Sequence, residues 1–162
     1  MKFHMRTGSK PGLNRKLLPF RVAVVHLSDT GLFVSIIFRS DADIYRKLLS
    51  DKLQTNLGYL YENAVAQALT SAGRKLYFHT WNKAQSTHSY EIDFILSSSS
   101  KIIPVEVKSS AVRNHDSMIA FCGKYSSIVG RRILFSQKDV SKDGSIELKP
   151  IYMLPFFLEE IS

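Results

Sequence analysis

The residues best suited to carry chemistry lie in two neighbouring segments that alternate between apolar and polar side chains. Asp93 lies in segment 90–96, and Glu106 and Lys108 lie in segment 101–108. Alternation with a period of two is typical of half-buried strands, and a run of serines, 97–100, separates the two segments. We therefore predict a β-hairpin with one charged face. Its apolar face is expected to hold Tyr90, Ile92, Phe94, Leu96, Ile103, Val105 and Val107.

The register of this hairpin decides how close its carboxylates lie. A turn formed by the serines pairs Leu96 with Lys101 and places Glu91 opposite Glu106. In this register Asp93 is a diagonal neighbour of Glu106, about 7–8 Å away at the backbone. Two carboxylates at that separation can bind one cation between them.

A cation held there would suit the hydrolysis of a phosphodiester, which needs a nucleophilic water and compensation of the phosphate charge. Mg²⁺ or Mn²⁺ takes oxygen ligands, usually one or two carboxylates with waters. We predict Asp93, Glu106 and the carbonyl oxygen of Val107 as ligands. Lys108 shares a face with Glu106, so it could orient or help deprotonate the water, or neutralise developing charge.

A fourth candidate, Glu62, lies in the clearest predicted helix, residues 55–72. Thr55 can cap this helix, and Gly73 can end it. Glu62 lies at the margin of the apolar stripe, from which it could reach the edge of a covered sheet and hold a ligand water or a second ion. A solvated glutamate near a helix N-terminus is the alternative. The stripe comprises Leu57, Leu60, Tyr61, Ala64, Val65, Ala68 and Leu69.

The hairpin charges also have a purely structural interpretation, in which Lys108 balances Glu106 on a solvent-facing side of the sheet. That interpretation leaves two further carboxylates crowded on the same face. The five histidines show no metal-ligand spacing, and we expect them to be scattered over the surface.

The remaining periodic segments predict an α/β fold in which a central mixed sheet is flanked by helices. Helix 115–125 is expected to turn Met118, Ile119, Phe121 and Cys122 inward. Residues 139–144 are expected to form a loop, and residues 156–161 close the chain with apolar side chains. Further strands are predicted at 21–27, 76–81, 131–136 and 146–153, and further helices at 32–38 and 41–49.

Composition describes a single globular domain with an uneven charge distribution. The single cysteine, Cys122, excludes an internal disulfide and fits a reducing compartment. No run approaches the about 18 apolar residues of a membrane span, and no signal peptide is evident, so we expect a cytoplasmic protein without membrane contact. Much of the net charge of +8 lies in residues 1–20, a predicted flexible basic leader that either contacts nucleic-acid phosphates or is a solvated tail. Residues 21–162 are expected to form the domain.

Four motifs in a fixed order carry a family resemblance. They are His-Leu-Ser-Asp-Thr-Gly-Leu-Phe at 26–33, Leu-Tyr-Glu-Asn-Ala-Val-Ala-Gln at 60–67, Glu-Ile-Asp-Phe at 91–94 and Ile-Pro-Val-Glu-Val-Lys at 103–108. From about residue 22 onward the chain resembles the C-terminal domain of many bacterial and archaeal AAA-type ATPases, catalogued as domain of unknown function 4143. An Asp followed by a turn and Glu-x-Lys is also the signature of PD-(D/E)XK nucleases.

The resemblance implies a restriction-endonuclease-like fold with Glu62, Asp93, Glu106 and Lys108 at the nuclease-like positions. The sequence lacks a Gly-x-x-x-x-Gly-Lys-Ser/Thr loop, so we expect an isolated or truncated C-terminal part without an ATPase module. Two functions follow as hypotheses. One is a nuclease that uses Mg²⁺ or Mn²⁺ to hydrolyse DNA, and the other is a non-catalytic module that docks DNA or a protein partner for a separate AAA-type ATPase. A third is a remnant that folds but has lost its role.

Overall fold

The computed structural model describes residues 3–5, 25–27, 29–38, 43, 46–47, 57–83, 87–109 and 115–162. Most of the predicted leader and the predicted cap Thr55 lie outside these residues. Of the predicted helix 41–49, only Asp43, Arg46 and Lys47 are described, and they are helical.

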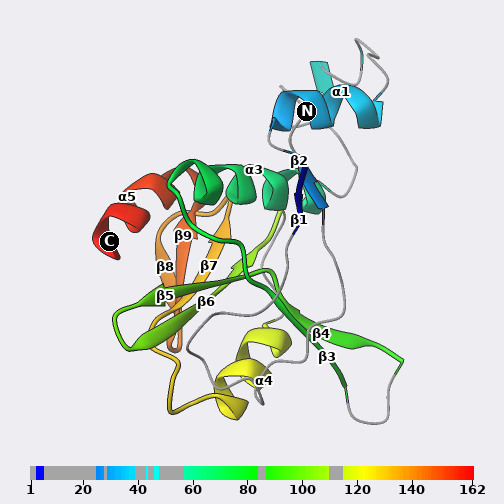
Figure 1. Cartoon of the computed structure of the whole chain (residues 1–162). Coiled ribbons are helices and arrows are strands. Elements are labelled where there is room, and N and C mark those ends of the chain that lie inside the picture. Colours follow the sequence, from blue (N-terminus) through cyan, green and yellow to red (C-terminus); the bar gives the residue numbers. More distant parts are fainter. Residues whose placement is uncertain are drawn as a thin grey trace.

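A five-stranded mixed sheet forms the centre of the domain (Figure 1). Its order is β5 (Phe94–Ser98), β6 (Lys101–Val107), β7 (Arg132–Ser136), β9 (Ile146–Pro150) and β8 (Ser141–Asp143). The three middle strands are parallel, and the two edge strands run antiparallel to their neighbours. Parallel strands covered on both faces are rich in apolar residues without alternation, which explains why residues 102–107 of β6 are all buried.

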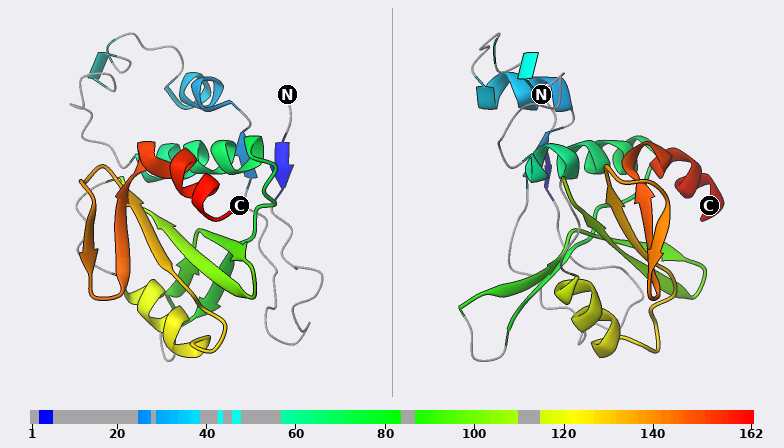
Figure 2. Two further views of the ribbon diagram at one scale, coloured as in Figure 1. Left: turned by 90° about the vertical axis from the view of Figure 1, so that its left-hand side faces the viewer. Right: turned by 180° about the vertical axis from the view of Figure 1, so that it is seen from behind.

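Two helices cover one face of this sheet, α3 (Gly58–Ser71) and α5 (Leu154–Glu160), as Figures 1 and 2 show. Gly73 ends α3 with a φ of +72°, a left-handed conformation that suits glycine. The predicted stripe of α3 is correct for Val65 and Leu69. The shared core consists of Val65, Ala66, Leu69, Phe94, Leu96, Ile103, Val105, Val107, Ile133, Phe135, Leu154, Phe157, Leu158 and Ile161.

The opposite face is covered by α4 (Asp116–Lys124), which completes a three-layer α/β arrangement (Figure 2). Met118, Phe121 and Cys122 are buried as predicted, whereas Ile119 is 63% exposed. Residues 118, 121, 122 and 125 follow the helical spacing of one stripe, and Ile119 falls outside it. The second core consists of Ile92, Ile95, Ile102, Met118, Phe121, Cys122, Tyr125, Val129, Leu134, Ile146 and Leu148.

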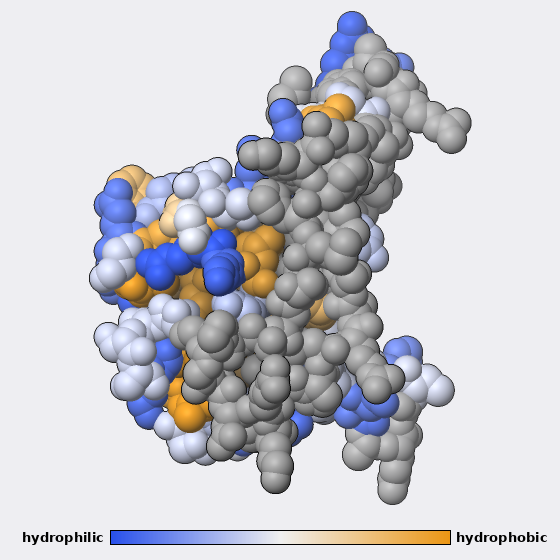
Figure 3. All heavy atoms as spheres, in the orientation of Figure 1, coloured by the Kyte–Doolittle hydropathy of each residue, from blue (hydrophilic) through white to orange (hydrophobic). Residues whose placement is uncertain are grey.

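Two smaller antiparallel pairs accompany the central sheet. Phe3–Met5, expected in a loop, forms β1 and pairs with β2 (Val25–Leu27). Strands β3 (His79–Asn82) and β4 (Ser89–Ile92) form a hairpin that projects from the body of the domain (Figure 1). Figure 3, in the same orientation, shows apolar surface lying between hydrophilic side chains on the left-hand side of the molecule.

Helix α1 (Thr30–Phe38) is capped by Asp29, whose Oδ1 accepts the N–H of Leu32 at 2.9 Å. Its first residue is attached to α3, since the Thr30 hydroxyl donates to Gln67 Oε1 at 2.6 Å.

The C-terminal third differs from the prediction in its boundaries. The expected loop 139–144 contains edge strand β8, and the expected strand 146–153 ends at Pro150, before the 3₁₀ turn η1 (Ile151–Met153).

None of the helices in the described residues has the length and apolar character that a membrane span requires.

Candidate functional site

The first arm of the predicted hairpin is two strands rather than one. A bend at Asp93 separates β4 from β5, and β4 pairs with β3, where Glu91 lies opposite Thr80. Glu91 therefore does not face Glu106 as predicted. The predicted common face of Ile92 and Phe94 is also wrong, because Ile92 packs in the core beneath α4 and Phe94 packs beneath α3. Because of this bend, the side chains of β4 and β5 do not continue one alternation between the two faces, although the sequence pattern alternates without a break through residue 93.

The register of β5 with β6 is shifted by two residues from the prediction. Leu96 lies opposite Ile103, and Ser98 lies opposite Lys101. The turn contains only two residues, and Ser99 takes the positive φ of 49° that such a tight turn needs. A shift of two preserves the faces of the strands. The pairing of β5 with β6 ends at Phe94 and Val105. If this register is continued by one residue, Asp93 lies directly opposite Glu106. The backbone separation of the two residues is then shorter than that of the predicted diagonal position.

Asp93 is held by the main chain of β6. The N–H of Val107 donates to Asp93 Oδ2 at 2.7 Å, at the point where β4 has turned away from the sheet. The carboxylate thus takes the place of a carbonyl acceptor on a neighbouring strand. The N–H and C=O of a strand residue point to the same side, so the Val107 carbonyl also points toward the side of Asp93.

Glu106 is buried in this environment. It is 1% exposed, and its Oε1 has no hydrogen-bond partner among the described residues. Lys108 Nζ lies 3.6 Å from Glu106 Oε2, and the Lys108 side chain is 42% exposed. Because α4 covers this face of the sheet, the solvent-facing ion-pair network considered above does not describe Glu106.

Burial raises the pKa of Glu106 from 4.5 to about 7. The positive charge of Lys108 and a hydrogen bond from the main chain of Met118 act to lower this pKa, and the negative charge of Asp93 acts to raise it. Met118 lies in the first turn of α4, so the N-terminal end of that helix faces the carboxylate. At neutral pH the carboxyl group is therefore divided between its protonated and ionised forms.

Glu62 comes from the other helical layer. It is half-buried on α3, and the hydroxyl of its neighbour Tyr61 accepts a hydrogen bond from Gln137 Nε2. Gln137 directly follows β7, Lys108 directly follows the parallel strand β6, and parallel strands end at the same edge. The first turns of α3 therefore lie at the sheet edge where Asp93, Glu106 and Lys108 are brought together.

The donor atoms fit a small divalent cation. Two carboxylates and a main-chain carbonyl are oxygen ligands of the kind that Mg²⁺ prefers, and the unpartnered Glu106 Oε1 is a buried acceptor that a cation would satisfy. No group of three or more His, Cys, Asp or Glu side chains forms a metal centre within the described ranges. A cation held by Asp93, Glu106 and Val107 would need water oxygens to complete its coordination.

Of the histidines that sequence analysis placed on the surface, His79 is buried and His115 is partly buried. His79 is 1% exposed, stacks on Trp81 with 4.9 Å between ring centroids, and lies 3.2 Å from the Tyr125 hydroxyl. The side chain of His115 is 9% exposed. His79 lies in a segment rich in aromatic residues, which is the only sequence signal for its burial. Cys122 is buried, as predicted.

Fold and site together define an α/β domain in which a carboxylate pair lies at one edge of a central mixed sheet. Residues 57–154 match the family described as Domain of unknown function (DUF4143), and the chain belongs to that family. The matched residues contain all four predicted site side chains. No curated protein and no solved structure matches the chain.

Proposed function

We propose that this domain is a nuclease-like domain that hydrolyses DNA phosphodiesters with Mg²⁺ or Mn²⁺ held by Asp93 and Glu106. The observation that carries the proposal is the buried Glu106 carboxyl, whose unpartnered Oε1 lies in a site shared with Asp93 and Lys108. A buried carboxyl with a raised pKa beside a second carboxylate is typical of functional sites.

The order of elements supports a restriction-endonuclease-like core. Helix α3 is followed by the β3–β4 hairpin, then by β5 and β6 and by α4, and β7 lies parallel to β6. The candidate residues cluster where β6 ends, between the two helical layers. The resemblance of the sequence to the C-terminal domains of AAA-type ATPases supports an origin of this domain in systems that contain such an ATPase.

Each side chain has a distinct part in the proposed reaction. A bound ion supplies a polarised phosphoryl oxygen and a more acidic water. The Val107 N–H fixes the orientation of Asp93, and Glu106 must lose its proton before it can bind the ion. The partly exposed Lys108 ammonium is placed to neutralise charge on an approaching phosphate. Glu62, at the same sheet edge, would hold a ligand water.

A second candidate function is a non-catalytic module that docks DNA or a protein partner for an AAA-type ATPase. It is favoured by a set of aromatic rings with lysines above them. Lys83 Nζ lies 4.5 Å from the Tyr90 ring centroid, and Lys124 Nζ lies 5.9 Å from that of Trp81. Aromatic rings beside cations suit stacking on nucleic-acid bases.

DNA cleavage by the full chain tests the first proposal. Supercoiled, linear and single-stranded DNA should be incubated at pH 8, where Glu106 is mostly ionised, with Mg²⁺, with Mn²⁺ or with a chelator. We expect cleavage only with metal. Asp93→Asn retains an oxygen that can accept the Val107 N–H, so it removes charge with little change in shape. This variant and Lys108→Ala should each slow cleavage by about 100-fold or more.

Two matched substitutions serve as controls. Lys101→Ala removes an exposed lysine at the opposite end of β6, and Glu159→Gln removes an exposed carboxylate on α5. Both should retain the wild-type rate. Absence of cleavage by folded wild-type protein with either metal would exclude the nuclease. DNA binding that survives Asp93→Asn but weakens in Lys83→Ala and Lys124→Ala would then support the docking module.

A further inference from the structure

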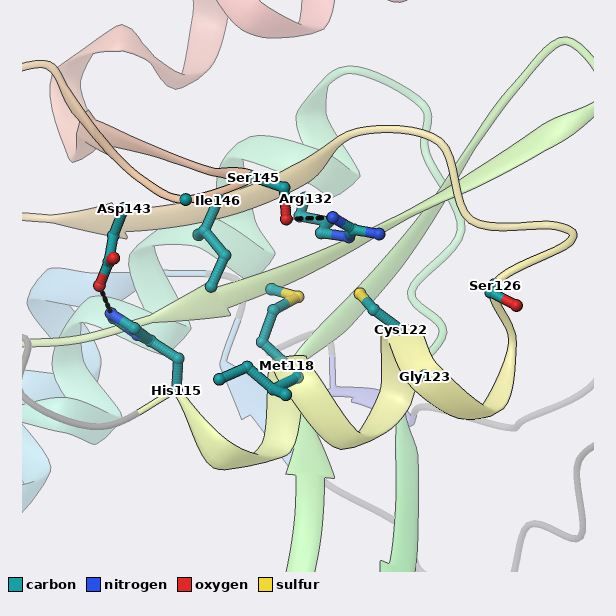
Figure 4. A pocket seen from close by; sticks show the side chains of 11 residues that line it. His115, Met118, Cys122, Gly123, Ser126, Arg132, Asp143, Ser145 and Ile146 are labelled. Carbon is teal, nitrogen blue, oxygen red and sulfur yellow. Dashed lines mark hydrogen bonds and ion pairs between the residues drawn. The ribbon is translucent and has the colours of Figure 1, made fainter.

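A second site lies between α4 and the turn that joins β8 to β9. A pocket of about 510 Å³ opens there, and Figure 4 shows side chains from both elements directed into it. Met118 lines this pocket with its side chain, while its main chain faces Glu106 on the other side. The volume lies in the range of small-molecule sites, about 300–1,000 Å³. Neither candidate function above uses this pocket.

Arg132 brings a positive charge to the pocket without a paired carboxylate. Its Nη1 donates to the Ser145 hydroxyl, and its Nε is buried and has no hydrogen-bond partner among the residues that the structure describes. None of the carboxylates in the described ranges forms an ion pair with it. The adjacent Arg131 is the contrast, because its guanidinium contacts Glu147 and Glu160 at 2.7 Å each. The charge of Arg131 is thus neutralised internally, whereas that of Arg132 is directed to the pocket.

His115 contributes a second unsatisfied nitrogen to the same pocket. Its Nε2 lies 3.1 Å from Asp143 Oδ2, which fixes the orientation of the ring. Its Nδ1 is buried and has no hydrogen-bond partner in the part of the chain that the structure describes. A buried polar atom without a partner is costly, and both side chains that carry such an atom line this pocket. Arg132 and His115 thus bring polar groups to one pocket from separate elements.

We propose that this pocket binds a small organic oxyanion, with a carboxylate or phosphate head attached to an apolar body. The planar guanidinium of Arg132 is suited to two parallel hydrogen bonds with such a head, and the Ser145 hydroxyl lies beside it. Met118, Ile119 and Ile146 supply the apolar wall for the body. The proposal does not depend on cleavage of DNA.

Calorimetric titration of the full chain at low ionic strength tests this site. The probes are benzoate and phenyl phosphate, with benzyl alcohol as the neutral counterpart and inorganic phosphate as the head group alone. We expect saturable binding of benzoate or phenyl phosphate, and the stronger of the two identifies the head group. Benzyl alcohol and inorganic phosphate should each bind at least about tenfold more weakly than the stronger probe, because each lacks one half of the recognised chemistry.

Arg132→Gln should weaken binding of the stronger probe by about tenfold or more, the scale of a lost charge-assisted hydrogen bond. The matched control is Lys138→Gln, which removes the same charge from an exposed position beyond the opposite end of β7, and it should bind as wild type does. Circular dichroism checks that both variants are folded. Equal affinity of folded Arg132→Gln and wild type would overturn the proposal.

Two substitutions of opposite charge at one position on the rim of the pocket give a test that leaves the core unchanged. Ile119 lines the pocket and is 63% exposed, so a polar side chain there stays in water. Ile119→Lys should strengthen binding of the probe and Ile119→Glu should weaken it, each by a few-fold. Absence of saturable binding by wild type at millimolar probe, or identical affinities of the two Ile119 variants, would exclude an anion site.

Discussion

Replacing Glu106 by glutamine changes the charge of the candidate site while nearly preserving its shape. In the folded protein the pKa of Glu106 is about 7, whereas the ordinary value is 4.5. Between these two pH values the folded state keeps a proton that the unfolded state has released. By linkage, the free energy of unfolding of the wild type must fall as pH rises through this window. Glutamine does not titrate, so the variant lacks this loss.

The size of the effect follows from the two proton affinities. A tenfold difference in proton affinity corresponds to about 1.4 kcal/mol, so a pKa raised from 4.5 to about 7 costs the wild type about 3 kcal/mol once the group is fully ionised. The side chain of Glu106 is 2% exposed, so solvent screens this effect little. The pKa of about 7 already includes the attraction between Lys108 and ionised Glu106, and near pH 5 part of the loss has already occurred. We therefore expect Glu106→Gln to match the wild type near pH 5 and to exceed it by about 2–3 kcal/mol at pH 8.

Urea denaturation followed by circular dichroism at pH 5, 6, 7 and 8 measures this difference. Other titrating groups are common to both proteins and cancel in the comparison. The control is Glu159→Gln, an exposed position on α5 where a substitution should change stability by less than about 0.5 kcal/mol. A stability difference for Glu106→Gln that stays flat between pH 5 and 8 would refute the raised pKa. A variant less stable than wild type at pH 8 would show that Lys108 compensates the ionised carboxylate fully.

Three further predictions concern residues outside the candidate site. Burial, aided by the charge of Lys124, lowers the pKa of His79 from 6.5 to about 4, so wild-type stability should fall as pH drops through this window. His79→Phe suits the surrounding aromatic rings and should reduce this fall in the free energy of unfolding. Denaturation curves recorded from pH 7 to 4 measure the change. Gly123→Ala should raise stability by about 1 kcal/mol, because a Cβ in α4 meets no atom within 4 Å and alanine favours the helix. Gly144→Ala should lower stability, since Gly144 has a φ of +55°, and thermal melts of both glycine variants measure the two changes.

The elements with strong local periodicity were predictable from the sequence. Helix α3 and its glycine stop follow from a 3.6-residue apolar stripe that ends at Gly73. In α4 the inward residues Met118, Phe121 and Cys122 follow from the same period. The apolar β-branched content of β6 and β7 marks them as strands. These features depend on interactions within one element, which a short window of sequence contains.

The features that the sequence did not predict depend on partners far away in the chain. The alternating pattern passes through Asp93 without a break, so nothing local shows that β4 leaves the sheet to pair with β3. The burial of Glu106 likewise depends on α4, which covers the face of the sheet that local alternation assigns to solvent. His79 is buried because Trp81, Phe121 and Tyr125 surround it, and two of these rings come from α4 and its C-cap, far along the chain from β3.

The buried carboxyl makes the stability of this domain and its proposed affinity for a cation depend on the same proton. Above pH 7 the ionised Glu106 lies in a poorly solvated position beside a second carboxylate, which destabilises the fold. A cation held by Asp93 and Glu106 would bind only the folded state and would offset this cost. Because its ligands must be deprotonated, the same rise in pH that weakens the metal-free fold would strengthen cation binding. Stabilisation by Mg²⁺ or Mn²⁺ should therefore be greatest where the metal-free protein is least stable, a coupling that an ion bound only to surface carboxylates would not show.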